Sequence, residues 1–151
     1  MPASVCQAAR SIGKDECMDL LLAKQRMHEA RVGRLGTVTL DGRPHLVPVC
    51  FALVDEVVYT AVDAKPKSTL KLRRLQNIEA NPATCLLVDH YDENWTHLWW
   101  VRLDGSARVV GSAPEEERAK NALTVKYPQY ETVAIPGPVI AFEIAAWTVW
   151  P

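Results

Sequence analysis

Two runs of alternating apolar and polar residues, joined by a tight turn, dominate the first half of the chain. Leu35–Leu40 alternates like a half-buried strand, and Asp41-Gly42 is a strong hairpin signal. A return strand at 45–53 is interrupted by Pro48, and a third strand follows at 57–62. Because proline donates no ladder hydrogen bond, we expect Pro48 at a sheet edge, at a bulge or at a ligand-facing break. This pattern commits the chain to antiparallel pairing.

The remaining periodic segments complete a count of six strands with two or three helices. They predict strands at 85–88, 96–110 and 139–146, and helices at 15–32, from Ser68 to before Asn81-Pro82, and from Ser112 to about 125. Ser112-Ala113-Pro114-Glu115 resembles a capping box, with a cap serine and a glutamate three residues later. No strand–helix–strand alternation is visible, which argues against a doubly wound sheet. A small closed barrel is the natural way for such strands to avoid open edges.

Composition favours one soluble domain over residues 1–151. The chain has 151 residues, 48% of them hydrophobic, enough for a single core. A net charge of −1 argues against nucleic-acid binding, and no apolar run approaches a membrane span. The first residues lack the apolar core of a signal peptide, and the four cysteines form no CxxC pair. We therefore expect a cytoplasmic protein with reduced thiols.

The clearest pointer to a ligand is a basic run between the third strand and the following helix. It holds five of the seventeen basic residues and no acid: Lys65, Lys67, Lys71, Arg73 and Arg74. Ammonium groups beside the Ser68 and Thr69 hydroxyls, at a helix start, suit an anionic phosphate. A solvated helix face is the alternative, and it fits Lys71, Arg73 and Arg74 better than it fits Lys65 and Lys67.

The other candidate groups give weaker signals. Trp95, Trp99 and Trp100 fall within six residues, and on a strand Trp99 and Trp100 point to opposite faces, so Trp95 is the better ligand candidate. Cys50 is interpreted as a buried structural thiol. The four histidines show no metal spacing, and His90 with its neighbouring aspartates is interpreted as a solvated loop, so we predict no metal site.

The order of these pieces resembles a known family. The segments "LGTVTLDGRPHLVPVCFAL", "VDAKPKSTLKLRRLQNIEANPATCLLVDHYDENW" and "WWVRLDGSARVV" are similar to the pyridoxamine-phosphate-oxidase-like split β-barrel family. The similarity runs from about Ala30 to the C-terminus. "KPK", "LRRLQNIEANP", "DENW" and "KYPQY" resemble the B group of flavin/deazaflavin oxidoreductases, in the branch that uses coenzyme F420.

The resemblance implies a mainly β fold, a six-stranded antiparallel split β-barrel with flanking helices, in which residues 1–30 form a helical segment packed on the barrel. It also implies a homodimer with cofactor sites at the subunit interface. The strand from Pro44 to Cys50 would run along the cofactor ring, and the basic loop would hold its phosphate. The implied cofactor-binding residues are Pro48, Val49, Cys50, Lys65, Lys67, Ser68, Thr69, Trp95 and Arg102.

The leading functional hypothesis is an F420-dependent oxidoreductase that moves a hydride between the deazaflavin and a small unsaturated substrate. Trp100 stands where the flavin oxidases of the family carry a glutamine, which weakens the alternative of an FMN-dependent reductase or oxidase. A non-catalytic F420 carrier, or a protein that binds another planar ligand, is the third interpretation. Tyr127, Tyr130 and His97 are candidate proton donors, although Tyr127–Tyr130 is better interpreted as a packed turn.

Overall fold

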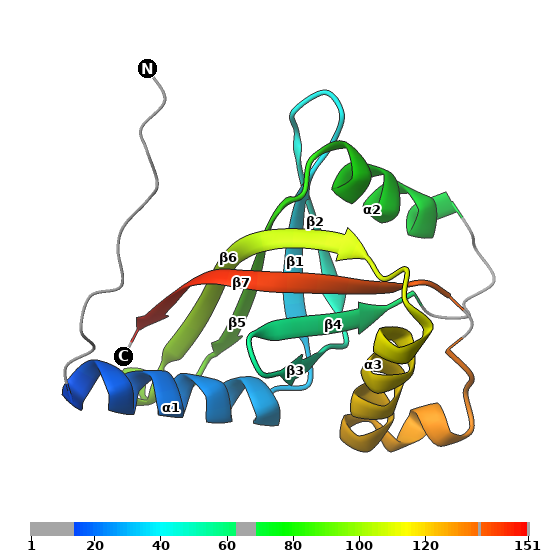
Figure 1. Cartoon of the computed structure of the whole chain (residues 1–151). Coiled ribbons are helices and arrows are strands. Elements are labelled where there is room, and N and C mark those ends of the chain that lie inside the picture. Colours follow the sequence, from blue (N-terminus) through cyan, green and yellow to red (C-terminus); the bar gives the residue numbers. More distant parts are fainter. Residues whose placement is uncertain (1–13, 63–68, 136, 151) are drawn as a thin grey trace.

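The computed structural model describes residues 14–62, 69–135 and 137–150 (Figure 1). Its elements in chain order are α1 (Lys14–Glu29), β1 (Gly33–Val38), β2 (Pro44–Val49), β3 (Ala52–Val54), β4 (Val57–Ala61), α2 (Thr69–Ala80), β5 (Ala83–His90), η1 (Trp95–His97), β6 (Trp99–Val109), α3 (Ala113–Lys126), η2 (Pro128–Glu131) and β7 (Val139–Trp150). Among these, no helix is long and apolar enough to cross a bilayer.

One curled antiparallel sheet contains all seven described strands, in the order β2-β1-β5-β6-β7-β4-β3. The predicted fold class, an antiparallel β structure with flanking helices, is confirmed. The strand number differs because the strand expected at 45–53 is divided into β2 and β3. The division falls at Cys50-Phe51 and not at Pro48, which pairs with Arg34 inside β2. The two edge strands are therefore consecutive in the chain.

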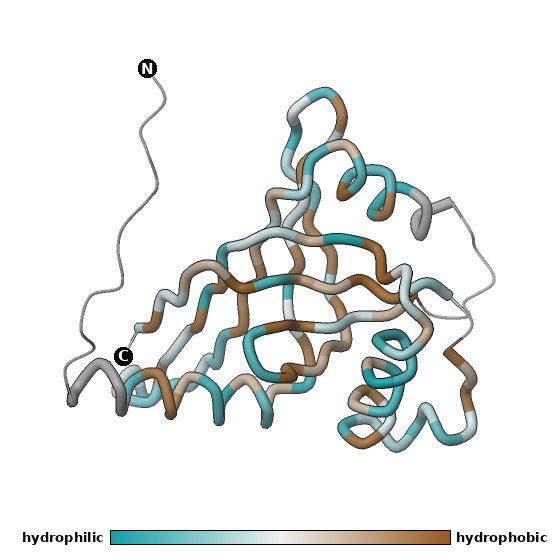
Figure 2. Tube along the Cα trace, viewed as in Figure 1, coloured by the Kyte–Doolittle hydropathy of each residue, from teal (hydrophilic) through white to brown (hydrophobic). Residues whose placement is uncertain are grey.

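The main core fills the inside of the curl. Strand residues that alternate inward, such as Leu35, Leu86 and Leu103, are no more than 1% exposed. α1 adds Ala23 and Met27 to this cluster, and α2 adds Ile78 with Leu75 packed against it. Figure 1 shows α1 and α2 at opposite ends of the sheet, and the tube in Figure 2 shows apolar residues recurring along the strands.

A second cluster packs α3 on the outside of the short strands. Ala119 and Leu123 of α3 are fully buried against Tyr59 and Ala61 of β4 and Ala141 of β7. These strand residues face away from the main core, since Val58 and Phe142 beside them belong to it. The helix thus covers the outer face only near β3, β4 and the start of β7.

The start of α3 corrects one sequence prediction. Ser112 is the N-cap residue, but its side chain makes no cap hydrogen bond. Glu115, the expected reciprocal partner, instead binds the Arg108 guanidinium at 2.8 and 3.0 Å and accepts a hydrogen bond from the Tyr59 hydroxyl at 3.0 Å. A charge-assisted bidentate pair outcompetes the capping geometry and fastens α3 to β6.

Two other boundaries also differ from the sequence prediction. The strand expected at 96–110 starts only at Trp99, because the Asn94 side chain accepts hydrogen bonds from Thr96 and caps η1. The last strand continues past 146 to Trp150, pairing along β6 as far as Trp100. Trp147 and Val149 turn inward and pack against the main core. Burial of these large side chains explains why the strand continues.

The β6–β7 bulge gives a stability prediction. At Gly105, where the register shifts, an added Cβ would lie 2.0 Å from the Glu143 carbonyl oxygen, whereas at Gly111 it would meet nothing within 4 Å. We expect Gly105→Ala to lower the free energy of unfolding by about 1–3 kcal/mol or more, because two backbones must separate. Chemical denaturation of both variants tests this, with Gly111→Ala as the near-neutral control. Equal effects would contradict the close-approach explanation.

Candidate functional site

The strand predicted to contact a cofactor ring lies at the edge of the sheet. β2 pairs with β1 on one side, and its other side has no partner strand among the described residues. Pro48 is exposed, Val49 is 5% exposed and Cys50 is half-buried where the strand ends. The edge position predicted for Pro48 is confirmed. Backbone groups along the open side of β2 are available to a ligand.

The end of β2 approaches the end of β4. Ala52 pairs with Tyr59, and Cys50 packs against the cluster that contains Ala61, the last residue of β4. The chain then enters the basic segment. Lys65, Lys67 and Ser68 lie outside the described residues, as does the side chain of Thr69, whose backbone starts α2. The first turn of α2 contains no acidic residue, so the partial positive charge of its N-terminus is not offset there.

One residue on β2 and one on β4 each carry a buried polar atom with no hydrogen-bond partner among the described residues, and sequence reasoning missed both. The Thr60 hydroxyl, on β4, is buried with no hydrogen-bond partner in the described structure. The same holds for Nδ1 of His45, near the start of β2. A buried polar group without a partner is costly, so such atoms mark places where a ligand or water can bind. Nothing in the local sequence distinguishes these two residues from ordinary strand residues.

A cavity of about 420 Å³ lies along the first half of β2. Its wall includes Leu46 and His45 of β2, Gly36 of β1, Cys85 of β5 and Asp104 of β6. A larger residue would not fit at Gly36, because an added Cβ would lie 2.7 Å from the Cys85 sulfur. The volume falls within the usual range for small-molecule sites.

The strand register places Pro48 and Arg102 in one row across the outer face of the sheet. Pro48 pairs with Arg34, Arg34 with Leu87, and Leu87 with Arg102. The row spans three strand spacings, or about 14 Å. Both arginines are already paired: Arg34 with Asp89 at 2.7 Å and Arg102 with Asp104 at 2.9 Å.

The tryptophans are distributed as their alternation predicts. Trp99 packs against the main core and stacks on His90, with ring centroids 6.0 Å apart. Trp100 pairs with Trp150 on the other face. Trp95 is 71% exposed on η1, beyond the end of β5.

The candidate proton donors are not equivalent. The Tyr127 hydroxyl lies 2.9 Å from the Arg31 carbonyl and 3.1 Å from that of Phe51, and it accepts a hydrogen bond from the Phe51 N–H at 3.1 Å. Burial, the largest contribution, raises the pKa of Tyr127 above its ordinary value. A hydroxyl so engaged holds the fold together, in agreement with the packed turn predicted for 127–130. His97 is exposed, and its Nδ1 lies 3.4 Å from Asp92.

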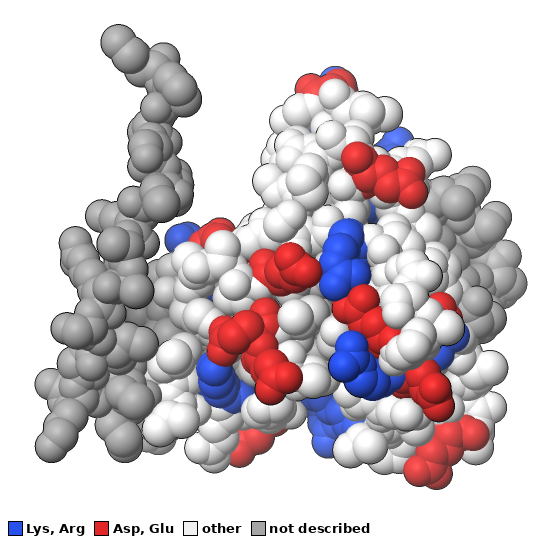
Figure 3. All heavy atoms as spheres, in the orientation of Figure 1, with Lys and Arg blue, Asp and Glu red and all other residues white. Residues whose placement is uncertain are grey.

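The charged groups on the face seen in Figure 3 show no single-sign patch. Acidic and basic side chains alternate there, and Arg108 bridges Glu115 and Glu143. Across the described residues, no three His, Cys, Asp or Glu side chains gather in a way that could hold a metal ion.

A sequence model of the family described as "Pyridoxamine 5'-phosphate oxidase" matches residues 22–151. Similar solved structures include a conserved hypothetical protein from Mycobacterium tuberculosis (19% identity, TM-score 0.70, covering 95% of this chain and 88% of that one). A FAD-binding protein from Mesorhizobium loti is 20% identical (TM-score 0.66, 86% and 90% covered). The heme storage protein HutZ from Vibrio cholerae is 12% identical (TM-score 0.65, 84% and 89% covered). At these identities the likeness shows the fold alone. No curated protein matches the sequence.

The Tyr127 hydroxyl gives the second prediction. We expect Tyr127→Phe to lower the free energy of unfolding by about 1–3 kcal/mol, because the buried Phe51 N–H and nearby carbonyls lose their partner. Urea denaturation measures the change. Tyr91→Phe is the matched control, since the Tyr91 ring is 64% exposed and its hydroxyl makes only a 3.5 Å contact to Glu93. A Tyr127→Phe protein as stable as this control would contradict the assignment.

Proposed function

Because this chain belongs to the pyridoxamine 5′-phosphate oxidase family, we propose that it binds a flavin-type cofactor, the deazaflavin F420, and is an oxidoreductase acting on a small unsaturated compound. The observation that carries this proposal is the open edge of β2 beside the end of β4. An extended backbone edge offers regularly spaced donors and acceptors to a planar heteroaromatic ring.

The residues around this edge fit such a cofactor. A flavin or deazaflavin carries a polar ring, a hydroxylated chain and a phosphate. The Thr60 hydroxyl, one residue before the end of β4, is a buried polar atom without a partner, and the helix N-terminus at Thr69 favours an anion. Lys65, Lys67 and Ser68 belong to the segment that joins these two places in the chain, and we assign the phosphate to them.

The positive charge on α2 favours F420 over FMN as the ligand, because F420 has an acidic tail. F420 has a phosphodiester and a polyglutamate tail, so it carries more negative charge. Arg73 of α2 is exposed and sits one turn beyond the helix start, where it would add a long-range attraction. Such steering weakens with salt because exposed charges are screened beyond about 10 Å at 0.1 M ionic strength.

A homodimer would complete the site. Leu46, Pro48 and Trp150 on the outer face stay exposed, and Leu87 and Trp100 are only half-buried in one chain. Exposed apolar side chains beside arginines, here Arg34 and Arg102, are common at protein interfaces. Trp95, exposed on η1, and Arg102, three strand spacings from Pro48, would then approach the cofactor from the partner subunit.

The protein's own contribution is binding and exclusion of water. The bound deazaflavin would supply hydride chemistry at its ring. Apolar side chains of the outer face, such as Leu46, would shield the reacting carbon, and the phosphate anchor would fix the ring's position along β2. Tyr127 is committed to the Phe51 backbone, so we assign no proton transfer to it.

Cofactor choice and phosphate anchor are tested together. We expect Lys65→Ala/Lys67→Ala to weaken F420 binding by roughly tenfold to a hundredfold, since a charge-assisted hydrogen bond contributes about 1.5–3 kcal/mol. Fluorescence titration with F420, FMN and FAD at two salt concentrations measures this. Arg118→Ala/Lys120→Ala removes the same charge from α3 and should leave affinity unchanged.

Two results of that titration would overturn parts of the proposal. Tighter binding of FMN or FAD than of F420 would replace the deazaflavin by a flavin. Unchanged F420 affinity in the Lys65→Ala/Lys67→Ala protein, with an unchanged thermal melt, would remove the phosphate from this segment. A tightly bound F420 that reduces no unsaturated probe compound would favour a carrier over an enzyme.

A substitution on the outer face tests whether this face forms the dimer interface. We expect Leu46→Asp to sediment as a monomer, because a carboxylate would be buried without a partner at the interface. Leu46 is 65% exposed in the single chain, so the fold itself should tolerate the change. Leu21→Asp on α1, where the leucine is 59% exposed, is the matched control and should remain dimeric. Identical sedimentation of both variants would place the interface elsewhere.

A further inference from the structure

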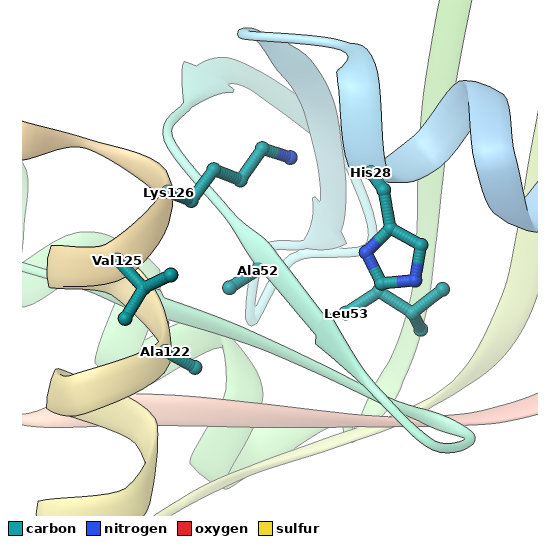
Figure 4. Close-up of a pocket in the computed structure, with 6 residues that line it drawn as sticks. All are labelled: His28, Ala52, Leu53, Ala122, Val125 and Lys126. Carbon is teal, nitrogen blue, oxygen red and sulfur yellow. The ribbon is translucent and has the colours of Figure 1, made fainter.

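A second cavity lies between α1, β3 and α3. Its volume is about 370 Å³, and its lining residues come from all three elements: His28, Ala52, Leu53, Ala122, Val125 and Lys126. Figure 4 shows Lys126 and His28 on opposing helices, flanking the strand that carries Ala52 and Leu53. Val125 is 84% exposed, so the cavity opens to solvent.

The lysine in this cavity has an unusual environment. Its ammonium lies 3.8 Å from the centroid of the Phe51 ring and 5.6 Å from that of Tyr127. It donates a hydrogen bond of 2.9 Å to the Met27 carbonyl, in the last turn of α1. None of the ion pairs between described residues joins it to a carboxylate. Aliphatic side chains form the nearby cavity wall.

A second cation, Arg31, lies near Lys126 and further disfavours its protonated form. The Arg31 guanidinium donates to the Lys126 carbonyl and lies 5.8 Å from the Tyr127 ring centroid. Burial first, and then the charge of Arg31, lower the pKa of Lys126 to about 8, while Cys50 opposes the shift. A lysine desolvated beside another cation is a typical nucleophilic lysine, since a larger fraction of its amine is unprotonated near neutral pH than in an ordinary lysine.

We infer that this cavity binds carbonyl compounds with an apolar substituent and that Lys126 joins them as a reversible Schiff base. The substituent would lie against Ala52, Leu53 and Ala122, and the carbonyl carbon would face the amine. Nothing in this site depends on which cofactor the protein binds.

The step balances without an oxidant or reductant. The Lys126 lone pair forms the N–C bond while the carbonyl π pair moves to oxygen, giving a carbinolamine. Loss of the oxygen as water, with the two amine protons, leaves the imine. His28 lines the cavity and provides a group that can carry these protons. When protonated, the imine keeps one N–H, which can still donate to the Met27 carbonyl and face the Phe51 ring.

Trapping by reduction tests the inference. Whole protein is treated with hexanal and sodium cyanoborohydride at pH 7.5, and the alkylated lysines are located by mass spectrometry of peptides. We expect Lys126 to be alkylated at least roughly tenfold faster than Lys120, which does not line the cavity and is held in an ion pair. Lys120 is the matched control on the same helix, because it pairs with Glu116 at 2.5 Å.

The pH profile gives a second readout. Labelling of Lys126 should rise through about pH 8, as its ammonium loses a proton, whereas ordinary lysines gain reactivity only toward pH 10 or above. The charged or titratable groups around it are Arg31, His28, Cys50 and Tyr127. Arg31→Met should move the profile to higher pH by removing the like charge.

Two variants distinguish the contribution of the Lys126 amine from that of the cavity around it. Lys126→Met should abolish the fast labelling, with a thermal melt confirming that the protein is folded. Ala122→Phe keeps the lysine and fills the cavity, and it should slow labelling by hexanal while sparing that by small, polar glycolaldehyde. Even labelling of Lys126 and Lys120 would overturn the inference, as would rapid hexanal labelling of Ala122→Phe.

Discussion

The structure depends on one phenolic hydroxyl at the break between β2 and β3, where the chain passes from one edge of the sheet to the other. Tyr127, at the end of α3, binds the carbonyl of Arg31 ahead of β1 and both backbone groups of Phe51 between β2 and β3. Three chain segments far apart in sequence are thereby held at one point. The contact satisfies backbone groups that a continuous strand would have paired, so the chain can leave one edge of the sheet and begin the other.

Local patterning predicts most of the fold because alternation and turn chemistry are short-range signals. Asp41-Gly42 forms the expected turn, with Gly42 at a φ of 81° that glycine adopts without strain. The number of strands could not be predicted, because the division at Cys50-Phe51 is imposed by Tyr127, 76 residues away in sequence. Pro48 is the only break visible locally, yet an edge strand tolerates proline without interruption.

Some features of the candidate site could be predicted from local sequence, whereas others depend on residues that are distant in sequence. The edge position of Pro48 and the opposite faces of Trp99 and Trp100 follow from proline chemistry and strand period alone. The unsatisfied Thr60 hydroxyl and the desolvated Lys126 amine depend on what surrounds them in space. Ser112 and Glu115 show the converse, since a strong local capping signal yields to Arg108, a residue from another element.

Phe51 connects the two proposed sites. Two consecutive residues at the C-terminal end of α3 contact it: the Lys126 ammonium lies over its ring, and Tyr127, the C-cap residue, binds its backbone. Cys50, the residue before it, ends the strand whose open edge we assign to the cofactor. A shift of Phe51 that accommodates an adduct on Lys126 would therefore strain the Tyr127 hydrogen bonds, because packed interiors transmit displacement and do not absorb it. The fully buried Phe51 thus contacts Lys126 through its ring and follows the β2 strand end directly in the chain.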